Sequence, residues 1–151
     1  MTVMKIACCS DESYPVHATI MRVVQELGHD IVRYGAFANG QEVPWALVAE
    51  EAAVAVASGV CDQGIFLCWT GTGISMAANK VSGIRAALCV DSATAIGARV
   101  WNHANVLCMS NRLVSEPIAK EILEAWFRTP DDDKGRQGVR LLREVEKRRC
   151  A

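Results

Sequence analysis

The chain has 151 residues, of which 51% are hydrophobic and 22% charged, and its formal net charge at pH 7 is −1. This length predicts a single domain, residues 1–151, built around one substantial core. The near-neutral balance is typical of an ordinary globular protein and indicates neither a nucleic-acid nor a membrane-surface partner. The apolar runs are too short to span a bilayer, and the N-terminal run lacks the pattern of a signal peptide.

The cysteine pattern argues against a disulfide scaffold and against a zinc site. Seven cysteines are present, an odd number, and no CxxC spacing occurs among them. Most lie inside apolar runs, where a free thiol packs as a small hydrophobic group. With only three histidines in the chain, we expect a reduced, cytoplasmic protein without disulfides, a metal site or a cofactor.

Strand-like and helix-like patterns alternate along the whole chain. Residues 5–10 are a short apolar run that predicts a strand, and helical spacing over 14–27, closed by Gly28, predicts the helix that follows it. The same reading predicts further strands at 30–35, 64–68, 84–90 and 105–110, and further helices at 45–58, 73–80, 92–103, 115–127 and 131–149. This order predicts an α/β fold, a Rossmann-like three-layer sandwich with a five-stranded parallel sheet.

Polar and glycine-rich segments follow three of these strands. They are CCSDES at 8–13, CWTGTG at 68–73 and SNR at 110–112. Ligands of parallel sheets bind beyond the carboxyl ends of the strands. The three segments therefore mark one candidate site.

The loop from Cys68 to Gly73 is suited to an anion. Its glycines permit a tight turn with accessible N–H groups, and a helix begins directly after it. Such a loop favours a phosphate or the oxyanion of an enediolate. It matches neither the P-loop nor the dinucleotide-binding pattern. A plain tight turn between strand and helix is the alternative.

Cys68 ends its strand at this loop, unlike Cys89 and Cys108, which we expect to be core thiols. A helix N-terminus favours a thiolate, and a strand end should leave the sulfur partly accessible. A thiolate there could be a nucleophile or a proton-abstracting base. Because no Cys–His hydrolase signature surrounds it, we favour the base.

The segment CWTGTGISMAANKVSGIRAALC at 68–89, followed by ANVLC at 104–108, resembles the ribose-5-phosphate isomerase B / galactose-6-phosphate isomerase family. The resemblance is collinear over nearly the whole chain and includes a C-terminal GRxxxR. It implies a metal-free aldose–ketose isomerase that acts on a small sugar phosphate through an enediolate. Cys68 would be the base, since Ile74 occupies the position of the glutamate that other members use.

The resemblance also assigns the remaining site residues. Thr70 would take part in catalysis near the sugar hydroxyls, and the loop amides would stabilise the enediolate oxygen. The loop residues are Trp69, Gly71, Thr72 and Gly73, the substrate contacts Asp11, Glu12, Trp101 and Asn102, and the phosphate-binding arginines Arg112, Arg136 and Arg140. The family implies a homodimer or tetramer with shared active sites, in which helix 131–149 packs on the partner subunit.

The departures from the family pattern lie in the site itself. Glu12 and Trp101 stand where histidines are expected, the latter being the ring-opening histidine. Trp69 replaces a glycine, and Phe37 a tyrosine. A four-carbon aldose phosphate cannot close a furanose ring and needs no ring-opening acid. We therefore hypothesise that the tryptophans reshape the pocket for a substrate other than ribose 5-phosphate.

Several alternatives remain open at this point. His103 could supply the proton of the missing histidine, or it could be a surface or capping residue. The substrate could be an N-acetylated or deoxy sugar phosphate. The chain could also be a catalytically inactive sugar-phosphate-binding or subunit-partner protein, although retention of Cys68 argues against this. A redox or hydrolytic cysteine enzyme is the least favoured alternative.

Overall fold

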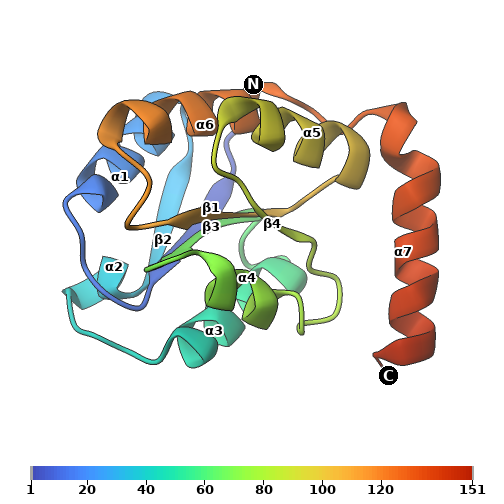
Figure 1. Ribbon diagram of the computed structural model, residues 1–151, viewed down its shortest axis with the longest axis horizontal. Helices are drawn as coiled ribbons and strands as arrows, with labels where there is room; N and C mark the ends of the chain where they lie inside the picture. The colour runs from blue at the N-terminus through green and yellow to red at the C-terminus, as the bar shows by residue number, and fades with distance from the viewer. Residues whose placement is uncertain (1, 151) are drawn as a thin grey trace.

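The computed structural model describes residues 2–150 and has an all-parallel sheet of five strands in the order β2-β1-β3-β5-β4. The strands are β1 Lys5–Ser10, β2 Asp30–Gly35, β3 Gln63–Cys68, β4 Ala86–Leu88 and β5 Val106–Ser110. The expected α/β sandwich is confirmed (Figure 1). The chain runs from β1 outward to β2 and then returns to the other side of β1 as β3. The switch in strand order therefore lies between β1 and β3.

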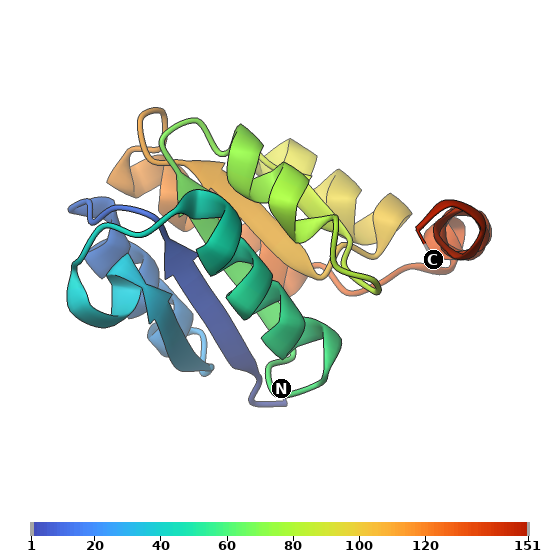
Figure 2. The ribbon, with the colours of Figure 1, turned by 90° about the horizontal axis from the view of Figure 1, so that it is seen from below.

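Helices cover both faces of the sheet. Three of them, α1 Val16–Glu26, α5 Ser92–Asn102 and α6 Glu116–Arg128, lie on one face, and α3 Trp45–Ala57 with α4 Thr72–Ala78 lies on the other (Figures 1 and 2). Within residues 2–150, no helix has both the length and the apolar character needed to cross a membrane.

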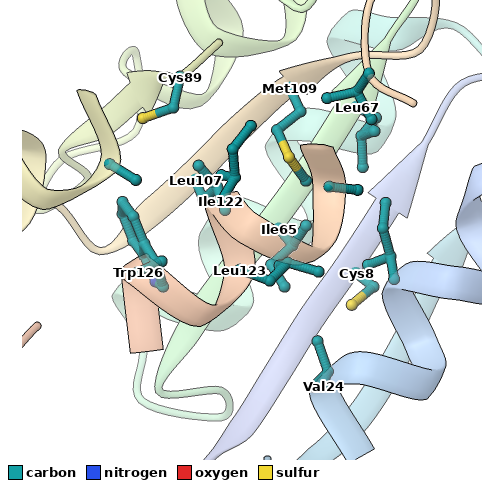
Figure 3. Close-up of a cluster of buried hydrophobic side chains, with 14 of the residues drawn as sticks. Cys8, Val24, Ile65, Leu67, Cys89, Leu107, Met109, Ile122, Leu123 and Trp126 are labelled. Carbon is teal, nitrogen blue, oxygen red and sulfur yellow. The ribbon is translucent and has the colours of Figure 1, made fainter. Parts of the chain in front are cut away.

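Each strand alternates its side chains between the two faces, so the sheet separates two cores. The core under α1, α5 and α6 includes Cys8, Ile65 and Met109, and Figure 3 shows it closed by the helix residues Leu123 and Trp126. The opposite core, under α3 and α4, is built largely from alanines and cysteines. These small side chains leave little space between helices and sheet, and they leave three thiols on the same side of the sheet as Cys68.

The observed elements differ from the predicted ones in three places. The predicted helix 131–149 begins as the 3₁₀ turn η1 Asp133–Gly135, and the α-helix is α7 Arg136–Arg149. The Asp132 carboxylate accepts a hydrogen bond from the Lys134 N–H (2.8 Å), which fixes this turn. A short helix, α2 Ala36–Asn39, was not predicted, and β4 is shorter than 84–90 because this edge strand pairs only with β5.

Helix α7 stands away from the sheet (Figures 1 and 2). Val139 is the buried residue of this helix, whereas Leu141, Leu142 and Val145 are each more than two-fifths exposed. Leu142 and Val145 line a groove between α7 and residues 83–87. An amphipathic helix with an uncovered apolar row is typical of an interface helix.

Candidate active site

Cys68 lies at the carboxyl end of β3, in the middle of the sheet between β1 and β5. Its side chain belongs to the core under α3 and α4, and the residue is only 5% exposed. The expectation of a partly accessible thiol is therefore wrong for this structure. The reason is tertiary: both neighbouring strands are paired with β3, and the loop after Cys68 folds back over the end of the sheet.

Gly71 allows this loop to fold back. Its φ is +78°, and a Cβ at this position would lie 2.6 Å from Leu88 Cδ1 and 3.0 Å from the Met109 backbone. Only glycine avoids both the steric clash and the left-handed strain. The sequence reading of the glycines as turn residues holds at Gly71, where the loop is packed against β4 and β5.

The loop after Cys68 is hydrogen-bonded to residues at the end of β5, and its threonine side chains are exposed. Ser110 Oγ and the Arg112 N–H both donate to the Trp69 carbonyl, at 2.8 and 3.1 Å. The hydroxyls of Thr70 and Thr72 lie 2.7 Å apart, and both residues are exposed. Amides at the start of α4 precede its first intrahelical bond and remain available to a ligand.

One indole belongs to the loop, and a second approaches it from α3. Trp69 is 53% exposed, and its ring stacks on Tyr14 with centroids 5.7 Å apart. On the other side, the Trp45 ring at the start of α3 lies 3.1 Å from the position of a Cβ on Gly73. Large aromatic side chains therefore lie at the start of the loop, where Trp69 meets Tyr14, and at its end, where Trp45 meets Gly73.

The loop after β1 brings carboxylates to the same edge. Tyr14 Oη donates a hydrogen bond to Glu12 Oε2 at 2.5 Å, and this bond raises the pKa of Tyr14 to about 12. Asp11 Oδ1 is inaccessible and has no hydrogen-bond partner among residues 2–150. Burial raises the pKa of Asp11, so this carboxyl takes up a proton more readily than a solvated one.

Three other buried thiols, two of them in the same core as Cys68, are held in the neutral form. Burial raises the pKa of Cys9 and of Cys108, and it raises the pKa of Cys89 to about 12. These residues are fully enclosed core groups, as expected for Cys89 and Cys108. Their sulfur atoms therefore have neither the access nor the ionisation that a base requires.

The remaining predicted residues divide between two edges of the sheet. Arg112 is exposed and directly follows β5, at the edge of Cys68. Trp101 and Asn102 end α5, close to the amino end of β5 and therefore at the opposite edge. Arg136 begins α7 beside them, since Gly135 packs against the Trp101 carbonyl. Arg140 follows one turn later, and both arginines are exposed.

His103 has a local structural role. It caps the C-terminus of α5 with a φ of +45°, and its Nε2 lies 2.7 Å from the Asp132 carbonyl oxygen. This contact joins the end of α5 to the turn before α7. It places His103 at the edge opposite Cys68, in agreement with the capping interpretation.

The family model described as Ribose/Galactose Isomerase matches residues 6–143. This chain belongs to that family. Its members are sugar-phosphate isomerases, which are intramolecular oxidoreductases, and the predicted enzyme class is confirmed.

Individual relatives match over most of the chain. It is 33% identical to ribose-5-phosphate isomerase B of Escherichia coli over 93% of this chain and 95% of the relative. It is 39% identical to D-erythrulose-4-phosphate isomerase of Pectobacterium atrosepticum over 72% of each chain. The structure of Clostridium thermocellum ribose-5-phosphate isomerase B superposes with a TM-score of 0.89 and 35% identity, covering 96% of this chain and 99% of that one.

Several residues of the site were missed from the sequence. Tyr14 and Trp45 lie in or beside helices, where aromatic residues are usually core. His17 and Asn111 are buried side chains that meet beneath the loops. The SNR segment after β5 indicated the region of Asn111, but no local pattern indicates its partner.

Proposed function

We propose that the chain interconverts a four-carbon ketose phosphate and its aldose, D-erythrulose 4-phosphate being the ketose. The observation that carries this proposal is the pair of indoles at the Cys68 loop, Trp69 within it and Trp45 against Gly73. They occupy volume that a longer or cyclic sugar would need. The similarity to the Pectobacterium D-erythrulose-4-phosphate isomerase supports the same substrate.

Cys68 is proposed as the base. Its thiolate takes a proton from C1 of the ketose, the C–H electron pair forms the C1–C2 double bond, and charge moves to the C2 oxygen. A proton then passes from the C1 oxygen to the C2 oxygen, and the Cys68 thiol returns its proton to C2 to give the aldehyde. The position of Cys68 supports this role, because it is the last residue of β3 and the chain continues directly into the loop whose amides could stabilise negative charge.

The surrounding groups are proposed to stabilise the enediolate and hold the sugar. Amides of the loop from Trp69 to Gly73 would donate to the enediolate oxygen, an arrangement that needs no reorganisation during the reaction. Thr70 and Asp11 would contact the sugar hydroxyls, and Glu12, held by Tyr14, would line the same side.

Phosphate binding is proposed to need a second copy of the chain. Arg112 shares the edge of Cys68, whereas Arg136, Arg140, Trp101 and Asn102 lie at the opposite edge. One chain therefore cannot bring both groups to one small sugar phosphate. A homodimer or tetramer in which α7 reaches across the interface would do so, and the arginine guanidinium groups would bind phosphate oxygens in pairs.

The test follows proton exchange in D2O by NMR with four-, five- and six-carbon sugar phosphates. We expect exchange at C1 or C2 to be fastest with the four-carbon pair and to be lost in Cys68→Ala. Cys61→Ala is the matched control, because Cys61 is also buried but lies before β3 at the other edge. Faster turnover of ribose 5-phosphate would contradict the substrate. Binding without any exchange would favour the inactive sugar-phosphate-binding alternative.

A further inference from the structure

Three buried polar side chains form a continuous hydrogen-bonded chain beneath the candidate site. They are His17 of α1, Asn111 after β5 and Ser10 at the end of β1, which are 5%, 8% and 0% exposed. His17 Nε2 lies 2.9 Å from Asn111 Oδ1, Asn111 Nδ2 donates to Ser10 Oγ at 3.2 Å, and Ser10 Oγ donates to the Glu12 carbonyl at 2.7 Å.

The hydrogen bonds of this chain run in one direction. The Tyr14 N–H donates to His17 Nδ1 at 3.4 Å, so Nδ1 is the acceptor and Nε2 carries the proton. Nε2–H then donates to Asn111 Oδ1, which turns the Asn111 amide nitrogen toward Ser10. Burial lowers the pKa of His17 and so favours the neutral imidazole, while the hydrogen bond with Asn111 opposes this shift.

Asn111 connects the two halves of the catalytic edge. Its backbone N–H donates to the Cys68 carbonyl at 2.9 Å, which holds the end of the strand that carries the thiol. Its side chain reaches the Ser10–Glu12 turn, where Ser10 Oγ also accepts from the Glu12 N–H at 3.4 Å. The β1–β3 ladder already sets Ser10 beside Leu67, the residue before Cys68, and Asn111 adds a side-chain connection from the Cys68 backbone to the Ser10–Glu12 turn beyond the end of that ladder.

A histidine at position 17 carries a desolvation cost that a purely structural position could avoid. Its ring stacks on Phe37 with centroids 4.3 Å apart and an interplanar angle of 16°. An apolar side chain could fill that space without a polar group to satisfy, and buried polar networks help only when every member is paired. The fully paired chain therefore points to a requirement for orientation at this edge.

We propose that His17 is a positioning residue for the isomerisation, which fixes the Asp11–Glu12 loop relative to Cys68 through Asn111 and Ser10. This inference rests on the proposed function, in which Asp11 and Cys68 act on the same sugar. His17 itself does not touch the substrate. Misplacement of a reacting group by about 1 Å can lower a rate by about a hundredfold.

The test compares His17→Leu with His17→Gln. Glutamine can still donate to Asn111 Oδ1, whereas leucine fills the space and leaves that oxygen unpaired. We expect His17→Leu to lower kcat by at least about tenfold with KM nearly unchanged, and His17→Gln to stay within about threefold of wild type. Equal activity of the two variants, at any level, would overturn the proposal.

Two further measurements keep the test decisive. The rate at which iodoacetamide alkylates Cys68 can be measured on the Cys68 peptide in the absence of sugar. This rate should differ from that of wild type in His17→Leu and should equal it in His17→Gln. This measurement does not require turnover. If the protein isomerises no sugar phosphate, the proposed function is contradicted, but the alkylation rates still test whether His17 positions the site. If His17→Leu does not fold, Asn111→Ala replaces it, with Asn111→Gln as its control; unchanged kcat and alkylation in Asn111→Ala would then overturn the proposal.

Discussion

Cys68 differs from the other buried cysteines in position rather than in burial. Cys9 and Cys108 lie within the strands, where burial raises the pKa of both thiols and no ligand can approach. Cys68 is the last residue of β3, and its backbone continues directly into the loop that carries free amides. A base at this point is enclosed and yet adjacent to the place where negative charge would develop.

Trp69 is predicted to set the length of the accepted sugar. Trp69→Ala should raise kcat/KM for five-carbon relative to four-carbon sugar phosphates by about tenfold, because it removes the indole that stacks on Tyr14. Steady-state kinetics with both substrates would measure the ratio. Trp69→Phe keeps an aromatic ring there and should shift the ratio less. An unchanged ratio in Trp69→Ala would refute this role.

At the scale of elements, the loops rather than the helices decide the geometry of the site. The β3–α4 loop is packed onto Leu88 and Met109 through Gly71, and the β1–α1 loop is tied to β5 through Ser10 and Asn111. Both loops follow neighbouring central strands, β1 and β3. Both loops therefore contact the same third strand end, that of β5.

Two glycines with similar positive φ angles, Gly59 and Gly71, allow the cost of backbone strain to be separated from the cost of a steric clash. Gly59→Ala (φ +82°) meets nothing within 4 Å and should cost about 1–2 kcal/mol of unfolding free energy from the left-handed backbone alone. Gly71→Ala (φ +78°) adds the clash with Leu88 and Met109. It should therefore be less stable than Gly59→Ala in urea denaturation and lose isomerase activity. Equal stability and full activity would show that the loop is not packed as described.

The α1–β2 connection is predicted to weaken at acid pH. His29 is 3% exposed, and its Nδ1 accepts a hydrogen bond from the Met4 N–H at 3.2 Å. Burial lowers the pKa of His29 from its ordinary value of 6.5, although Asp30 and Asp62 oppose this. Below 6.5 the unfolded chain binds more protons than the folded one, so the stabilising contribution is full above that pH and is lost as the pH falls.

His29→Gln tests this dependence, because an amide oxygen can accept the same N–H without titrating. The unfolding free energy of wild type should fall more between about pH 7.5 and about pH 5 than that of His29→Gln. Denaturant titrations at the two pH values give both slopes. If the unfolding free energies of the two proteins fall equally with pH, His29 is not the source of the acid destabilisation.

At the scale of the whole molecule, the predicted site residues form two groups that one chain keeps apart. The thiol and its loop lie at the carboxyl edge, and Asn102 with Arg136 lies at the amino edge. Helix α7 projects from the body of the molecule (Figure 2). Its residues Leu141 and Val145 are exposed. An assembly that covers this helix could also bring the two groups together.

Mixing two inactive variants tests the shared site. Cys68→Ala and Arg136→Ala, each nearly inactive alone, should form mixed dimers in which one site carries both changes and the other carries neither. Equal mixtures, after subunit exchange, should recover about a quarter of wild-type activity. Cys68→Ala mixed with Thr70→Ala, two changes on the same edge, should recover none. No recovery in the first mixture despite exchange would rule out sharing between subunits.

The sequence by itself determined the order of the strands and of every α-helix except α2, the glycine loop, the position of Cys68 and the family, because periodicity and motifs are local properties of the chain. It did not determine the burial of Cys68, the pairing of His17 with Asn111, or the position of Trp45 against Gly73. Those contacts depend on the order β2-β1-β3-β5-β4, which brings together strand ends far apart in the chain. The start of α7 at Arg136 depends on the local hydrogen bond between Asp132 and Lys134 together with the tertiary contact of the same turn with His103 at the end of α5.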